Sequence, residues 1–221
     1  MATNTQRRPQ FGRGALKLDP AKSVFLNCPY DEAFRPLFDA MVFATICCGF
    51  IPRSALESGT IAEPRMDRIT RAIFESRYSI HDLSRCHGEG DANLARFNMP
   101  LELGIAMARR YLANQGARRH DWLVLVPAGH DHRAVISDLQ GFDPPTHDGT
   151  VVSLVTTVVA WLATRPDAVR TPAPPQVLAY SADFGDEMAH LREAWGPHPP
   201  WADVVLAGLR VVRRLGGESR R

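Results

Sequence analysis

Short runs of apolar, strand-favouring residues alternate along this chain with segments in which apolar residues recur at helical spacing. The four runs span residues 23–28, 49–53, 78–82 and 121–127. The first starts sharply and stops at Pro29, as a strand buried on both faces of a parallel sheet does. Helical spacing follows the first three runs, from near Phe34, Pro64 and Asn98. The alternation predicts β-α-β units with right-handed crossovers, and therefore a three-layer α/β fold around a parallel sheet.

Glycine and proline residues indicate where these elements end. Gly49 stops the apolar spacing of the first helix at the position of a C-terminal cap. Pro52 lies in the second run and predicts that this strand sits at a sheet edge or ends there. Pro64 and Pro100 suit the first turns of helices, because an N–H group there has no partner within the helix.

The second half of the chain is predicted to be mainly helical. A helix is expected around residues 134–139, and a strongly apolar helix over Val151 to Leu162. That apolar run falls short of the roughly 18 to 20 residues that cross a bilayer, so we expect no membrane partner. Residues 166–175 are rich in proline and predict a linker, with one or two helices following over residues 183–215. The expected organisation is a basic N-terminal arm (1–22), an α/β domain (23–165) and a linker with a helical tail (166–221).

Charge and cysteine content narrow the classes of partner and compartment. The 221 residues include 26 lysines and arginines against 24 aspartates and glutamates, a net charge of +2. That balance does not supply the broad positive field that non-specific nucleic-acid binding needs, so nucleic acid is not the expected partner. The cysteines, at positions 28, 47, 48 and 86, form no C-x-x-C pair and predict reduced thiols. No secretory signal is visible, and we expect a cytoplasmic protein.

Candidate functional residues follow the predicted strands, because an open parallel sheet binds ligands beyond the carboxyl ends of its strands. The candidates are Asn27, Cys28, Pro29, Tyr30 and Asp31 after the first strand, Arg53 after the second, His81, Asp82, Ser84 and Arg85 after the third, and Arg96, Asn98 and Glu102 at the start of the next helix. We expect these carboxylates, arginines and the histidine to converge on one rim.

Glu102 and Asp82 form the candidate catalytic pair. Glu102 lies one turn into a helix, where the helix dipole favours an anion, and its neighbours Leu101 and Leu103 predict a mostly apolar environment. A carboxylate in that place can attack a cationic carbon or lie under it. The alternative is a solvated residue, because acidic side chains are common in the first turns of helices.

Four segments of the chain together carry a family resemblance. They are Val24-Phe-Leu-Asn-Cys-Pro29, Gly49-Phe-Ile-Pro52, Ser79-Ile-His-Asp82 and Pro100-Leu-Glu-Leu-Gly-Ile-Ala106. Over residues 23 to about 126 the chain resembles the nucleoside 2-deoxyribosyltransferase superfamily and the related Toll/interleukin-receptor-like nucleotide hydrolases. The resemblance implies a flavodoxin-like fold and a role in bacterial defence or stress. It also implies that Glu102 attacks or stabilises the anomeric carbon of a sugar, and that Asp82 contacts that sugar.

The chain also departs from the transferase pattern. Those enzymes often carry an Asp and a Gly-Thr ahead of the glutamate, where this chain has Arg96 and Asn98-Met99. Arginines 53, 85 and 96 suit a phosphate-bearing substrate better than a small deoxynucleoside, because a guanidinium group matches phosphate oxygens. The expected ligand is therefore a nucleotide, with a nucleoside as the smaller alternative.

The chemistry that the resemblance implies is cleavage of a glycosidic bond at a ribose carbon. The transition state resembles an oxocarbenium ion, which a carboxylate stabilises or captures before water or another base completes the reaction. A leaving group that is already cationic, such as nicotinamide, needs no strong general acid, so NAD is a candidate substrate and no cofactor is expected. The expected roles are ribose binding by Asp82, ligand orientation by Asn98 and Arg96, and phosphate binding by Arg53 or Arg85.

Several alternatives stay open at this stage. The rival function is a nucleotide-sensing or protein-interaction module that keeps the scaffold without catalysis. His81 either exchanges a proton or is a buried structural residue, and Cys28 is either a nucleophile or a small buried side chain. His81, Asp82, Cys86 and His87 are metal-ligand types, but their spacing matches no zinc pattern and no metal is expected. The strongly apolar helix either packs in the core or associates with a second copy, which leaves a homo-oligomer open.

Overall fold

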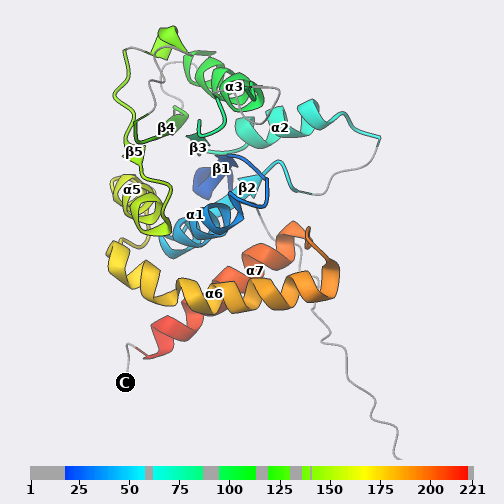
Figure 1. Cartoon of the computed structure of the whole chain (residues 1–221), viewed down its shortest axis with the longest axis vertical. Helices are drawn as coiled ribbons and strands as arrows, with labels where there is room; N and C mark the ends of the chain where they lie inside the picture. The colour runs from blue at the N-terminus through cyan, green and yellow to red at the C-terminus, as the bar shows by residue number, and fades with distance from the viewer. Residues whose placement is uncertain are drawn as a thin grey trace, which may run out of the picture.

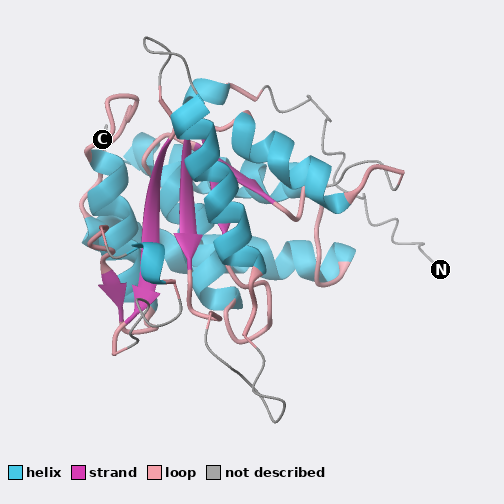
Figure 2. Cartoon of the chain, turned by 90° about the horizontal axis from the view of Figure 1, so that it is seen from above, coloured by secondary structure: helices cyan, strands magenta, loops and turns pink. Residues whose placement is uncertain are grey.

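The computed structural model of this chain is built on five parallel strands, and helices cover both faces of the sheet (Figure 1; Figure 2). It describes residues 18–57, 62–86, 95–112, 119–129, 136–139 and 141–218. The strands are β1 (Ser23–Asn27), β2 (Ile51–Ser54), β3 (Tyr78–Asp82), β4 (Asp121–Pro127) and β5 (Thr146–His147). The helices are α1 (Arg35–Cys47), α2 (Arg65–Phe74), α3 (Asn98–Leu112), α5 (Val151–Ala163), α6 (Pro174–Trp195) and α7 (Trp201–Glu218), with short 3-10 helices over Pro20–Lys22 and Ser137–Leu139.

The strands lie in the order β2-β1-β3-β4-β5, and every neighbouring pair is parallel. This is the flavodoxin-like order, in which the strand sequence reverses between β1 and β3. The predicted α/β fold with a central parallel sheet is confirmed. The position of Pro52 is confirmed too, because β2 is an outer strand of the sheet. In such a sheet the crevice beyond the carboxyl ends of β1 and β3 is the usual place for a ligand.

The predicted strands, the helices after the first three of them and the apolar helix α5 lie within two residues of their expected bounds. Strand β5 was not predicted, because two residues are too few to show a period. Helix α6 begins at Pro174, inside the segment predicted to be a linker. Its opening prolines occupy the first turn, where the missing N–H groups cost no helical hydrogen bond. Most of the predicted arm lies outside the described residues. Of the predicted helix over 134–139, residues 136–139 are described, and they contain the 3-10 helix Ser137–Leu139.

Helices α1 and α5 cover one face of the sheet, and α2 and α3 cover the other (Figure 1). Helices α6 and α7 pack against α1 and share its hydrophobic core. Phe43 of α1 stacks on Phe184 of α6 with ring centroids 5.0 Å apart. A Cβ atom on Gly208 of α7 would collide with Ile46 of α1, so glycine allows these two helices to approach closely. The helical tail is therefore continuous with the core on the α1 side.

The strongly apolar helix α5 directs its apolar face into this core. Leu154, Val158 and Leu162 are completely buried there, so that face is used within the chain. Within the described ranges, no helix combines the length and the apolar content that crossing a bilayer requires.

Candidate functional site

A hollow of about 300 Å³ opens where β1 ends and α3 begins. Its walls come from the turn after β1, the first residue of α2 and the start of α3. The lining residues are Asn27, Cys28, Pro29, Tyr30, Asp31, Arg65, Arg96, Asn98, Met99 and Glu102. Eight of the thirteen candidate residues named from the sequence are among them. The other five, Arg53, His81, Asp82, Ser84 and Arg85, are not.

The turn after β1 is held in place by its own side chains. Asp31 accepts a hydrogen bond through Oδ1 from the backbone N–H of Phe34, 3.0 Å away, just before α1 starts. The Tyr30 hydroxyl donates to the backbone oxygen of Leu26 at 3.0 Å and accepts from Ser54 Oγ at 3.2 Å. These bonds fasten the turn to β1 and β2, so the hollow has one fixed wall.

Asp31 also contacts two of the candidate arginines, Arg85 and Arg96. Arg85 contacts its carboxylate with Nε and Nη2, both at 3.1 Å, and Arg96 contacts it with Nη1 at 3.2 Å. Hydrogen bonding from Arg85 is the largest cause that lowers the pKa of Asp31. Asp31 is therefore ionised. Its negative charge offsets part of the positive charge of Arg85 and Arg96, which were expected to contact a ligand.

Glu102 lines the hollow and has no hydrogen-bond or salt-bridge partner among the described residues. Its residue is 6% exposed, and its carboxyl group makes no hydrogen bond or salt bridge with any residue that the structure describes. Burial raises the pKa of Glu102 from 4.5 to about 7, and the charge of Arg65 opposes that rise only in part. Near neutral pH the group is therefore divided between its ionised and protonated forms. It is not a solvated residue of a helix start.

Arg65 is the charged lining residue that sequence reasoning missed. It is exposed, it opens α2, and within the described ranges it forms no salt bridge or hydrogen bond. Pro64 marks the start of a helix in the sequence, but nothing in the local pattern indicates that this start returns to the end of β1. Arg65 is the cation at this hollow whose charge no described carboxylate pairs.

Asp82 does not line the hollow that contains Glu102. It is completely buried, with Oδ1 accepting from the backbone N–H of Ser84 at 2.9 Å and Oδ2 lying 2.9 Å from His147 Nε2. Strand alternation explains this position, because Asp82 shares its side of β3 with Tyr78 and Ile80, which belong to the α1 core. The alternation of side chains between the two faces of β3 is the sequence signal that indicates this placement.

His81 and Arg53 are likewise engaged elsewhere. His81 is fully buried with both ring nitrogens hydrogen-bonded, and burial, helped by His120, lowers its pKa to about 3. It reaches the hollow only through Asn27. Arg53 is 5% exposed and is paired with Glu57 at 2.6 Å and Glu75 at 3.6 Å.

Cys28 lies in the wall as a buried thiol. Burial is the largest cause that raises its pKa well above 9.0, and the charge of Asp82 adds to it, so a reactive thiolate is not favoured. In the part of the chain that the structure describes, no group of three or more potential ligand side chains is arranged to hold a metal ion. His87, one of the residues weighed for a metal, lies outside the described residues.

A scan against protein-family models finds no match to this chain, and searches of curated proteins and of solved structures find no significant relative.

Proposed function

We propose that this chain is an N-glycosidase that cleaves the base–ribose bond of a nucleotide or an NAD-like substrate, with the Glu102 carboxylate at the reacting carbon. The state of Glu102 carries the proposal. A glutamate shielded from water is ordinarily paired with a cation or hydrogen-bonded, whereas Glu102 has neither kind of partner among the described residues. A carboxyl group with a raised pKa at the edge of a ligand-sized hollow is typical of a functional site.

The reaction follows from that carboxylate. The bond between ribose C1′ and the base nitrogen breaks, and its electron pair leaves with the base. The ionised Glu102 stabilises the resulting positive charge at C1′ or forms an ester with it, and water then completes the hydrolysis. A cationic substrate favours the ionised form of Glu102, because an opposite charge nearby lowers the pKa of a carboxyl group. A nicotinamide leaving group departs neutral and needs no acid.

The charges around the hollow support a phosphate-bearing substrate with Arg65 as the phosphate ligand. Arg53 and Arg96 already contact carboxylates, and Arg85 holds Asp31. Arg65 makes no such contact with a described residue and borders the same hollow as Glu102. Asn98 and Arg96 are exposed at the rim, where they suit contacts to the rest of the ligand.

The test is turnover of two substrate classes. The protein is incubated with NAD and, separately, with deoxynucleosides, and the released nicotinamide or base is measured by chromatography. We expect release that Glu102→Gln reduces by about 10²–10³-fold, the range for loss of an electrostatic catalytic group. The matched control is Glu32→Gln, because Glu32 is exposed before α1 and should leave turnover unchanged. No turnover of either class, or equal turnover by the Glu102 variant, would overturn the proposal.

A second candidate function is a nucleotide sensor without catalysis, and the position of Asp82 favours it. With the Asp82 carboxylate bonded to Ser84 and near His147, Glu102 lacks the second carboxylate expected from the sequence. Calorimetry with NAD separates the two candidates. Binding that persists in Glu102→Gln, with no product from the wild-type protein, favours the sensor.

A further inference from the structure

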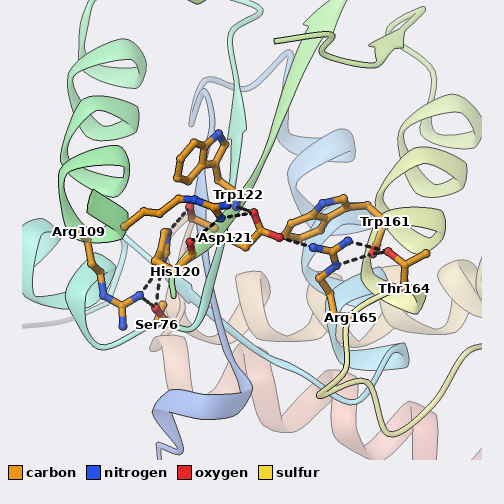
Figure 3. A network of polar contacts seen from close by, with 10 residues as sticks. Ser76, Arg109, His120, Asp121, Trp122, Trp161, Thr164 and Arg165 are labelled. Atoms are coloured by element: carbon orange, nitrogen blue, oxygen red, sulfur yellow. Dashed lines mark hydrogen bonds and ion pairs between the residues drawn. The ribbon is translucent and has the colours of Figure 1, made fainter. Parts of the chain in front are cut away.

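A chain of four buried hydrogen bonds leads from the hollow to the amino-terminal end of β3. Asn27 Nδ2 lies 2.8 Å from His81 Nδ1, His81 Nε2 lies 2.7 Å from Ser79 Oγ, Ser79 Oγ lies 2.8 Å from His120 Nε2, and His120 Nδ1 lies 2.9 Å from the backbone oxygen of Ser76. Each of these five residues is at most 2% exposed. Figure 3 shows the end of this series of hydrogen bonds that is farthest from the hollow, where the His120 ring lies beside Ser76 and Arg109.

The hydrogens of the bonds between Asn27 and Ser79 have one consistent direction. Asn27 Nδ2 also donates to the backbone oxygen of Met99 at 2.9 Å, and a carbonyl only accepts, so the orientation of the amide is set. His81 Nδ1 must then accept, which places the ring hydrogen on Nε2. Ser79 Oγ accepts that hydrogen from His81. At the far end, His120 Nδ1 lies near the Ser76 carbonyl, which only accepts, and near Arg109 Nη1, which only donates, so these contacts leave both tautomers of His120 open.

The direction requires His81 to be neutral, and the surroundings of both histidines favour the neutral form. Burial is the main cause that lowers the pKa of His81 to about 3, with His120 adding to it. Burial and then Arg109 lower the pKa of His120 to about 3, with Arg77 and Arg110 adding to the effect and the Ser76 carbonyl opposing it. A second proton on His81, at Nδ1, would face the Asn27 amide donor.

Asn27 lines the hollow, and both hydrogens of its amide are engaged by Met99 and His81. The side-chain atom left for a ligand is the carbonyl oxygen, Oδ1. We infer that the buried hydrogen bonds fix the orientation of the Asn27 amide. Asn27 then presents a hydrogen-bond acceptor to the hollow and selects a ligand group that donates a hydrogen bond. A pair of sugar hydroxyls has that chemistry, and the identification with a ribose rests on the proposed function.

The same bonds assign positioning roles to residues that a ligand does not touch. His81, Ser79 and His120 act on the ligand through the Asn27 amide. The bond from Asn27 to Met99 also holds the first turn of α3, the helix that presents Glu102. A flipped amide would lose the bond to Met99 and turn its donors toward the hollow, which reverses the preference for hydroxyl groups.

The ligand-free protein gives the first test. Long-range ¹H–¹⁵N NMR of histidine rings reports which nitrogen carries the hydrogen. We expect His81 to be protonated on Nε2 alone between pH 5 and pH 8. The opposite tautomer of His81, or a doubly protonated His81 ring at pH 7, overturns the inference. This measurement needs no variant, so a folding defect cannot obscure it.

The second test measures the preference for hydroxyl groups by calorimetry with two probes, adenosine 5′-monophosphate and its 2′,3′-dideoxy analogue. The wild-type protein should bind the hydroxyl-bearing probe about tenfold more tightly, the worth of one or two hydrogen bonds. Ser79→Ala releases the Asn27 amide and should reduce the ratio to about threefold or less. Thr45→Val, which removes a buried hydroxyl on the α1 side, should keep the ratio.

The outcomes separate this inference from the proposed function. Equal affinity of the two probes for the wild-type protein, which includes binding of neither, overturns the inference, and so does an unchanged ratio in Ser79→Ala. Neither result depends on turnover. Conversely, absence of base release from NAD and deoxynucleosides removes the proposed glycosidase while the His81 tautomer and the probe ratio still stand.

Discussion

The two faces of the sheet are built in different ways. On the α1 and α5 side, one apolar cluster runs from the strands through α1 to α6 and α7. On the α2 and α3 side, the apolar residues form two smaller clusters, one around Leu103 and one around Ile73. The α3 side also buries the polar side chains of Asn27, Ser79, His81 and His120. We therefore expect the first face to contribute most of the stability, whereas the second replaces part of its apolar contact with hydrogen bonds that position Asn27 at the hollow.

Truncating Phe43 should give the largest loss of stability, because its ring is completely buried on the α1 side and stacks on Phe184. For Phe43→Ala we expect the free energy of unfolding to fall by about 3–5 kcal/mol, measured by urea denaturation. Phe97, at 67% exposed, is the control, and Phe97→Ala should change stability by less than about 0.5 kcal/mol. A loss below about 1 kcal/mol for Phe43→Ala would contradict the assignment of stability to this face.

Glu102→Gln should stabilise the protein at pH 8 and leave it nearly unchanged at pH 4. The pKa of Glu102 is about 7 in the folded chain and 4.5 ordinarily, so the folded state holds this proton more strongly. Its contribution is complete below about pH 4.5 and is lost as the pH rises through 7. The expected gain at pH 8 is up to about 3 kcal/mol.

Urea denaturation of both proteins from pH 4 to pH 8 measures that difference. His81 and His120 contribute in the opposite sense, since their pKa values of about 3 lie below the ordinary 6.5 and their stability is lost as the pH falls. Both proteins contain these histidines, so the difference isolates Glu102. Parallel stability curves over the whole range would show that Glu102 titrates normally.

Removing the Ser79 hydroxyl should cost less than removing the Phe43 ring. Ser79→Ala leaves the Nε2–H donor of His81 and Nε2 of His120 without their Ser79 partner, and we expect a loss of about 1–3 kcal/mol in urea denaturation. Thr45→Val on the opposite face should cost about 0.5 kcal/mol, because the Thr45 hydroxyl bonds only to a carbonyl of its own helix. Equal costs would remove the distinction between the two faces.

The smallest expected effects come from two glycines of the C-terminal helices. Gly185 of α6 has open space where a Cβ would lie, so Gly185→Ala should stabilise by about 0.5–1 kcal/mol through helix propensity. Gly208→Ala should instead destabilise by about 1 kcal/mol, because the new methyl group meets Ile46. Thermal unfolding of both variants checks the opposite signs, and a gain in both would mean that α7 does not pack closely on α1.

The fold was largely predictable because its signals are local. The run Asp121–Pro127 reads as a strand, and Gly49, with φ +84°, ends α1 as a cap should. Proline was ambiguous: the same residue type that indicates a linker over 166–175 also opens α6. Strand β5 depends on pairing with Val126 and Pro127, which no local pattern reveals.

The sequence predicted most of the residues that form the candidate site, but it did not predict which of them form ion pairs with one another. Residues that end β1 and begin α3 line the hollow together, because parallel strands bring their carboxyl ends to one edge. Which arginines pair with Asp31 depends on where the residues after β3 and before α3 lie, and which one borders Glu102 depends on the return of α2 to that edge. Such pairing is a property of tertiary packing, and charge order along the chain does not encode it.

The contact between α7 and the outer strand β2 has a consequence for association. An exposed sheet edge offers backbone groups to which a strand of another molecule can add, a common start of aggregation. Pro52 presents neither group to an incoming strand, because proline has no N–H and its carbonyl accepts a hydrogen bond from the Trp201 indole at 3.0 Å. Helix α7 thus disfavours the addition of a strand from another molecule at the β2 edge of the sheet.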